Sequence, residues 1–99
     1  MNLLKDNMVH KTLVEILIQE DGVLILLDDG SNLKLYNNIL GSVDGSYIGC
    51  MVEDIEFTND LLIITLNGDL KIKMGMQEDD YLGPEAFFYY GADGIFISE

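Results

Sequence analysis

Residues 13–36 read LVEILIQEDGVLILLDDGSNLKLY. Three apolar runs are separated here by two short polar breaks, and each break contains Asp-Gly. Apolar runs of strand length bounded by such turn residues predict the order strand, turn, strand, turn, strand. We therefore expect residues 13–36 to form a three-stranded antiparallel meander.

Residues 52–74, VEDIEFTNDLLIITLNGDLKIKM, repeat this pattern after about 38 positions. The aligned segments are residues 16–18 with 55–57, residues 23–26 with 61–64, and the turn Asp29-Gly30 with Asn67-Gly68. Both dipeptides favour a type I′ turn, whose two central residues have positive φ. In this alignment the second copy is one residue shorter at each of two turns. Two copies are too few for a solenoid, so we expect two meanders that close on each other.

The meanders contain two kinds of strand. Residues 23–27 and 61–66 are apolar at consecutive positions, which is typical of central strands covered on both faces. In the first strand of the first copy, Val14, Ile16 and Ile18 are expected to share one face because side chains alternate along a strand.

The remaining segments complete a single all-β domain over residues 1–99. Residues 2–10 suit either one short helical turn or a lead into the first strand. Residues 37–49 and 75–84 are rich in Gly, Ser, Asn and Asp and predict polar loops. Residues 86–98 predict a C-terminal hairpin that begins with the aromatic strand AFFYY. About eight antiparallel strands, with little or no helix, predict a small barrel or sandwich.

Charge is the most informative part of the composition. The chain has 18 acidic residues against five lysines, lacks arginine, and carries a formal net charge of −13. Such a field repels nucleic acid and anionic membranes, because binding to both depends on basic side chains. It attracts basic proteins. The alternative is that the acidic residues only keep a small domain in solution.

The cysteine content and the first residues indicate a compartment. Cys50 is the one cysteine, which excludes an intrachain disulfide and a cysteine-based zinc site. Residues 1–6 contain no apolar signal segment, and no apolar run approaches the roughly 20 residues of a membrane span. We therefore expect a cytoplasmic location. We also expect no cofactor.

Two acidic groups are candidate binding residues. Glu78, Asp79 and Asp80 are adjacent and could contact a cation or a basic partner, although runs of like charge usually face water. Asp54 and Glu56 should point to one side of their strand as an acidic stripe. The stripe suits a docking face, and it equally suits protection of a strand from edge-to-edge aggregation.

No set of residues indicates catalysis. The single histidine, His10, has no partners nearby in the sequence for acid–base or metal chemistry. The serines lack a nucleophile-elbow motif, and the oxygen-rich segment 28–32 is explained by turn formation. We therefore expect a protein without enzymatic activity and without a bound metal.

The C-terminal part carries a resemblance. Tandem meanders followed by Tyr81, Gly83, Pro84, Glu85 and Ala86 resemble small bacterial proteins of uncharacterised function that end in a Y-x-G-P-E-A segment. Some of these are similar to immunity proteins encoded beside secreted toxins. The resemblance implies a protein-binding role and brings no catalytic residue.

The leading hypothesis is a non-enzymatic acidic protein that docks to, or neutralises, a basic protein partner. The expected partner-binding residues are Asp54, Glu56, Glu78, Asp79, Asp80, Tyr81 and Glu85. The first alternative is a self-associating β module, a homodimer formed through apolar sheet faces. The second is a β-barrel that binds a cation or small ligand.

Overall fold

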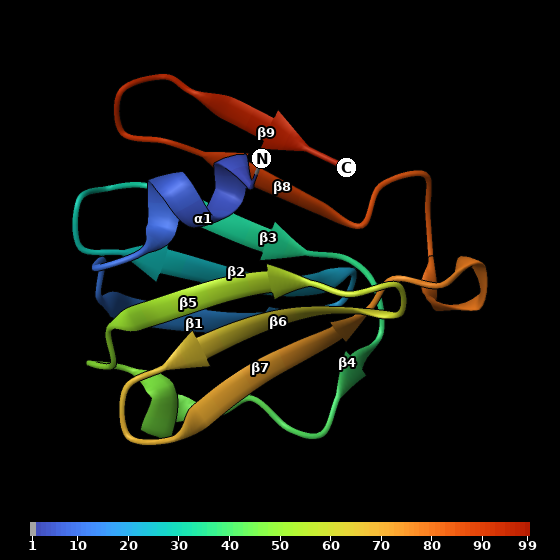
Figure 1. The fold of residues 1–99 in the computed structure, drawn as a ribbon, viewed down its shortest axis with the longest axis horizontal. Coiled ribbons are helices and arrows are strands. Elements are labelled where there is room, and N and C mark those ends of the chain that lie inside the picture. The colour runs from blue at the N-terminus through green and yellow to red at the C-terminus, as the bar shows by residue number, and fades with distance from the viewer. Residues whose placement is uncertain (1) are drawn as a thin grey trace.

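The computed structural model describes residues 2–99, which form two antiparallel sheets (Figure 1). The five-stranded sheet has the order β1–β2–β3–β8–β9, and the four-stranded sheet has the order β4–β7–β6–β5. The strands are β1 (Leu13–Gln19), β2 (Gly22–Leu27), β3 (Asn32–Leu35), β4 (Ile39–Leu40), β5 (Val52–Phe57), β6 (Leu61–Leu66), β7 (Leu70–Gly75), β8 (Phe87–Tyr90) and β9 (Phe96–Ser98). The expected all-β fold and the C-terminal hairpin are confirmed, and the two separate sheets exclude a closed barrel.

The hydrophobic core lies between the two sheets, because alternate residues of the strands point inward. In β2 the buried residues are Val23, Ile25 and Leu27, and β6 repeats the same pattern with Leu62, Ile64 and Leu66. Phe87 and Tyr89 of β8 are also fully buried. The large apolar area removed from water here is the main source of stability.

The expectation that β2 and β6 are covered on both faces is wrong. Each strand alternates between buried and partly exposed positions along its whole length. Leu24 and Leu26 therefore lie on the outer face of the five-stranded sheet, where no second layer covers them. A two-layer sandwich buries one face of each sheet, and apolar residues on the outer face remain available for contact.

The two meanders match position by position at an offset of 39 residues. Ile16 pairs with Ile25 in the first meander, and Ile55 pairs with Ile64 in the second. The next pairs, Ile25 with Leu33 and Ile64 with Ile72, keep the same offset. The sequence alignment made the second copy one residue shorter at each of two turns, and the strand pairing shows that the two copies have equal length. Val23 therefore corresponds to Leu62 and not to Leu61.

Each meander begins with a β-bulge at the same place, between Leu13 and Glu15 and between Val52 and Asp54. The extra residue shifts the alternation, so Leu13 is buried and Val14 is exposed. The predicted shared face is therefore wrong for Val14, whereas Ile16 and Ile18 do share a face, opposite Ile25 and Val23 of β2, although Ile18 is exposed at the strand end.

The predicted type I′ turns at Asp29-Gly30 and Asn67-Gly68 are not formed. In the first turn Gly30 has a φ of 89°, while Asp29 does not have a positive φ. In the second turn the two residues with positive φ are Gly68 and Asp69. The first turn thus lacks the second positive φ that the predicted type requires, and in the second turn the pair of positive φ values lies one residue later than predicted.

The segment that follows each meander joins the sheet formed by the other meander. After β3 the chain crosses to place β4 beside β7, and after β7 it crosses to place β8 beside β3 (Figure 1). The segment predicted as a polar linker, residues 37–49, thus contains the additional strand β4 and a short 3₁₀ helix, η1 (Gly45–Tyr47). This is why the described residues form nine strands rather than about eight.

An approximate two-fold axis relates the two halves and passes near an isolated bridge between Thr12 and Met51. The Thr12 N–H donates to the Asp28 side chain at 3.3 Å, and the Met51 N–H donates to the Asn67 side chain at 3.0 Å. Backbone hydrogen bonds between the two halves also occur in equivalent pairs. The repeat thus extends from the strands to the contacts that join the halves.

The ambiguous segment 2–10 contains one short helix, α1 (Leu3–Met8), which packs against β5. The Asn2 side chain accepts a hydrogen bond from the Lys5 N–H at 2.9 Å and so caps the helix. Its amide nitrogen also donates to the Ile55 carbonyl at 2.9 Å. Leu4 and Met8 are buried on the inner side of the helix.

Candidate functional site

The outer surface of β3, β8 and β9 carries a cluster of four aromatic side chains. We call it the aromatic face: Tyr36, Phe88, Tyr90 and Phe96. Because Phe87 and Tyr89 point into the core, their neighbours Phe88 and Tyr90 point outward. Phe96 pairs with Tyr90 across the hairpin, and Tyr36 directly follows β3.

The rings of the aromatic face contact one another. Phe88 and Phe96 have ring centroids 5.1 Å apart, Tyr90 and Phe96 4.9 Å, and Tyr36 and Phe88 5.8 Å. Tyr90 is 54% exposed and Phe96 is 48% exposed. Ring pairs at these distances stabilise the hairpin, and large apolar side chains left in solvent in one patch are typical of a contact surface.

A hollow of about 500 Å³ lies at one end of the aromatic face. We call it the acidic hollow. Its lining consists of Glu20 and Asp21 from the β1–β2 turn, Tyr36, the segment 82–85, and Phe88. Three carboxylate residues thus line the same hollow as two aromatic rings and Pro84. The acidic hollow combines negative charge with apolar walls, which suits a cationic group attached to an apolar stem.

The electrostatics of the acidic hollow are set partly by a lysine of the chain. Lys34 Nζ lies 2.8 Å from Asp21 Oδ1 and 5.3 Å from the centroid of the Tyr36 ring. The hydrogen bond from Lys34 lowers the pKa of the Asp21 carboxyl below its ordinary value. Glu20 and Glu85 form no ion pair among the described residues, so the acidic hollow keeps a net negative charge.

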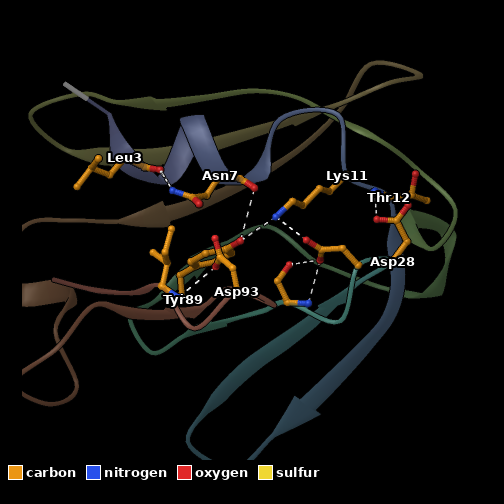
Figure 2. Close-up of polar contacts among 10 residues, drawn as sticks. Leu3, Asn7, Lys11, Thr12, Asp28, Tyr89 and Asp93 are labelled. Atoms are coloured by element: carbon orange, nitrogen blue, oxygen red, sulfur yellow. Dashed lines mark hydrogen bonds and ion pairs between the residues drawn. The ribbon is translucent and has the colours of Figure 1, made fainter.

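A separate polar cluster joins α1, the β2–β3 turn and β8 (Figure 2). Lys11 Nζ donates to the Tyr89 hydroxyl at 3.0 Å and lies 2.7 Å from Asp29 Oδ2. Asp29 also accepts hydrogen bonds from the N–H and the hydroxyl of Ser31. The Tyr89 hydroxyl donates to the Asn7 carbonyl at 3.5 Å.

This cluster holds elements together. Burial raises the pKa of Asp29, but hydrogen bonds from Lys11 and Ser31 outweigh that effect and lower the pKa to about 2. Ser31 is fully buried and its hydroxyl donates to Asp29, so it is not presented to solvent as a nucleophile. The charge of Lys11 is directed inward in the same way (Figure 2).

The structure distributes the seven predicted partner-binding residues over several elements. Asp54 and Glu56 lie on β5, the edge strand of the four-stranded sheet, and Lys5 pairs with Asp54 at 2.8 Å. Glu78, Asp79 and Asp80 form the short 3₁₀ helix η2 (Glu78–Asp80). Asp80 accepts a hydrogen bond from the Gln77 N–H at 3.1 Å.

Of these seven residues, Glu85 lines the acidic hollow, while Tyr81 packs against the core and lines another hollow beside Phe57 and Phe87. The aromatic face was not among the candidates predicted from the sequence. The signal that could have found it is the alternation in residues 87–90: two rings point inward, so two must point outward.

Among residues 2–99, no three His, Cys, Asp or Glu side chains are arranged to hold a metal ion. No helix in this part of the chain is long and apolar enough to cross a membrane. No family model, curated protein or solved structure matches the chain.

Proposed function

We propose that the protein binds a basic protein partner through the aromatic face and the adjoining acidic hollow, as a non-enzymatic docking or neutralising protein. The observation that carries this proposal is the exposure of Tyr90 and Phe96 on a chain whose net charge is −13. Protein interfaces combine a desolvated centre, often aromatic, with a charged rim, and the two surfaces provide these parts. The resemblance to small bacterial proteins, some of which are similar to immunity proteins, supports the same role.

The charge distinguishes this role from self-association. Two copies that approach each other through the aromatic face would each bring a net charge of −13. A basic partner would instead be attracted over about a Debye length, which is roughly 8 Å at physiological salt. A hetero-complex is therefore favoured over the homodimer.

The proposed function is tested by affinity capture from a lysate of the source organism. The wild-type chain is compared with a double variant, Tyr90→Ser and Phe96→Ser, and bound proteins are identified by mass spectrometry. Because exposed aromatic anchors often contribute at least about 2 kcal/mol each, we expect a basic protein to be retained by the wild type and lost by the double variant.

Leu40→Ser is the matched control. Leu40 is 49% exposed, close to the 48% of Phe96, and it lies on β4 in the other sheet. This variant should retain the partner. Capture that is equal for the wild type and the double variant would contradict the proposed function.

A further inference from the structure

The acidic hollow has mainly apolar walls, and its charged lining residues are hydrogen-bond acceptors. The side chains of Glu20, Asp21 and Glu85 supply carboxylate oxygens, and the one neighbouring ammonium group, Lys34, is paired with Asp21. The walls between the carboxylates are the rings of Tyr36 and Phe88 together with Leu82 and Pro84. An occupant that fits must donate hydrogen bonds, carry positive charge, and have flat or apolar surfaces to lie against the rings.

Asn37 provides an independent observation. A smaller hollow of about 230 Å³ shares Glu20, Asp21, Tyr36 and Leu82 with the acidic hollow, and Asn37 contributes to its lining. Asn37 is only 3% exposed. Its Nδ2 donates to the Gly75 carbonyl at 2.8 Å, which fixes the orientation of the amide.

The other end of that amide has no partner. Asn37 Oδ1 is buried and accepts no hydrogen bond from the described residues. A buried acceptor without a donor is unfavourable, and a group of this kind in a folded protein calls for a partner from outside the chain, such as a water, an ion or a bound molecule. The unpartnered oxygen thus belongs to a residue that lines the smaller hollow, next to the three carboxylate residues of the acidic hollow.

The chain already contains an example of the chemistry that this site would use. Lys34 lies over the Tyr36 ring with its ammonium group on a carboxylate. A second cation entering the acidic hollow would find Glu20 and Glu85, which have no such pair, and the ring of Phe88.

We propose that the acidic hollow receives an arginine side chain of the partner protein. Arginine presents a planar cation with five hydrogen-bond donors and no acceptor, and the plane stacks on aromatic rings. This chain has no arginine, so a second copy of it cannot supply the occupant. The inference rests on the proposed function, since the arginine belongs to the protein that docks on the aromatic face.

The test is a titration of the ¹⁵N-labelled chain of residues 1–99 with N-acetyl-arginine amide, in which amide chemical shifts are measured. N-acetyl-citrulline amide, which has the same shape without the charge, is titrated in parallel. We expect arginine amide to shift the signals of Glu20, Asp21 and residues 82–85 with a dissociation constant of about 1–10 mM, and citrulline amide to bind at least about 5-fold more weakly.

Two variants locate the binding. Glu85→Gln should weaken arginine amide by about 3- to 10-fold, because it removes a charge from the acidic hollow without changing the shape of the side chain. Glu53→Gln removes the same charge from an exposed position of β5 and should leave binding unchanged. Equal binding of the two amides, or shifts spread equally over Glu56 and Glu78, would overturn the inference.

The inference and the proposed function can fail separately. If arginine amide binds in the acidic hollow while no captured protein depends on Tyr90 and Phe96, the arginine site remains and the docking role is wrong. If a partner is lost from the Tyr90→Ser and Phe96→Ser variant but arginine amide leaves the spectrum unchanged, docking remains and the arginine site is wrong.

Discussion

His10 and Gly49 occupy equivalent positions in the two halves of the molecule. The His10 N–H donates to the Val52 carbonyl at 2.8 Å, and the Gly49 N–H donates to the Leu13 carbonyl at 2.7 Å. Both residues have positive φ, 76° for His10 and 91° for Gly49. Only glycine adopts this backbone conformation without a steric cost, so the first half is strained where the second is not.

We predict that His10→Gly stabilises the protein by about 0.5–1 kcal/mol, since it relieves the left-handed strain at an exposed position. The measurement is the free energy of unfolding in urea. The reciprocal change, Gly49→Ala, should destabilise by about 1 kcal/mol through the backbone alone, because no atom lies within 4 Å of the added Cβ. A destabilised His10→Gly variant would contradict the equivalence of the two positions.

Asp29 gives the stability of the protein a pH dependence. Its pKa in the folded state is about 2, below the ordinary value of 3.8. The folded state is therefore favoured by the ionised carboxylate above about pH 4, and this contribution is lost as the pH falls through about 2.

We predict that Asp29→Asn destabilises the protein by about 1 kcal/mol at pH 7, a value that includes a discount for solvent screening of the partly exposed carboxylate. The difference between variant and wild type should shrink as the pH falls from about 5 to about 2. Urea unfolding at several pH values measures it. A difference that stays constant over this range would show that the Lys11 ion pair does not contribute.

At the scale of elements, β2 and β3 approach each other closely where β2 begins. A Cβ added to Gly22 would lie 2.3 Å from the Leu35 carbonyl oxygen, which is backbone and cannot rotate away. Because residue 22 has no side chain, the start of β2 can lie this close to β3. This contact positions the β1–β2 turn, which supplies Glu20 and Asp21 to the acidic hollow.

We predict that Gly22→Ala destabilises the protein by about 2–3 kcal/mol, because the two strands must move apart. Gly45→Ala is the matched control: its Cβ meets no atom within 4 Å and its φ is not positive, so the change should stay within about 0.5 kcal/mol of the wild type. Thermal unfolding of the two variants compares them directly. Equal effects would mean that β2 and β3 are not closely packed at this end.

The whole molecule is a negatively charged two-sheet β fold that carries the aromatic face on its outer surface. Three of the five lysines are paired with aspartates, at Lys5, Lys11 and Lys34, and the remaining lysines lie on β7. The aromatic face favours association, while the net charge of −13 opposes association of identical copies. The balance between these two effects determines the assembly state.

We predict a monomer at low ionic strength, because repulsion between two copies is then least screened. Sedimentation velocity at about 20 mM and about 500 mM salt, over a range of protein concentrations, measures this. A dimer that forms at low salt and is lost in the Tyr90→Ser and Phe96→Ser variant would favour the self-associating β module instead.

The outward-pointing rings of the aromatic face, and the fact that each sheet exposes one face, could not be predicted from the sequence. Apolar runs bounded by turn residues revealed the strands of both meanders, because both signals are local in the sequence. Inward-facing residues are three positions apart at each β-bulge, at Leu13 and Ile16 and again at Val52 and Ile55. In the sequence alone this spacing only interrupts the period of two, and the strand pairing is needed to recognise it as a bulge.

Sequence alone determined an all-β chain with a repeated hairpin pattern, an acidic surface and a C-terminal hairpin, because strand periodicity, turn residues and net charge are properties of neighbouring residues or of composition. Tertiary structure decided the exchange of β4 and β8 between the sheets, and with it the acidic hollow. The hollow joins residues 20–21, 36 and 82–88, and only the pairing of β8 with β3 brings such distant segments together.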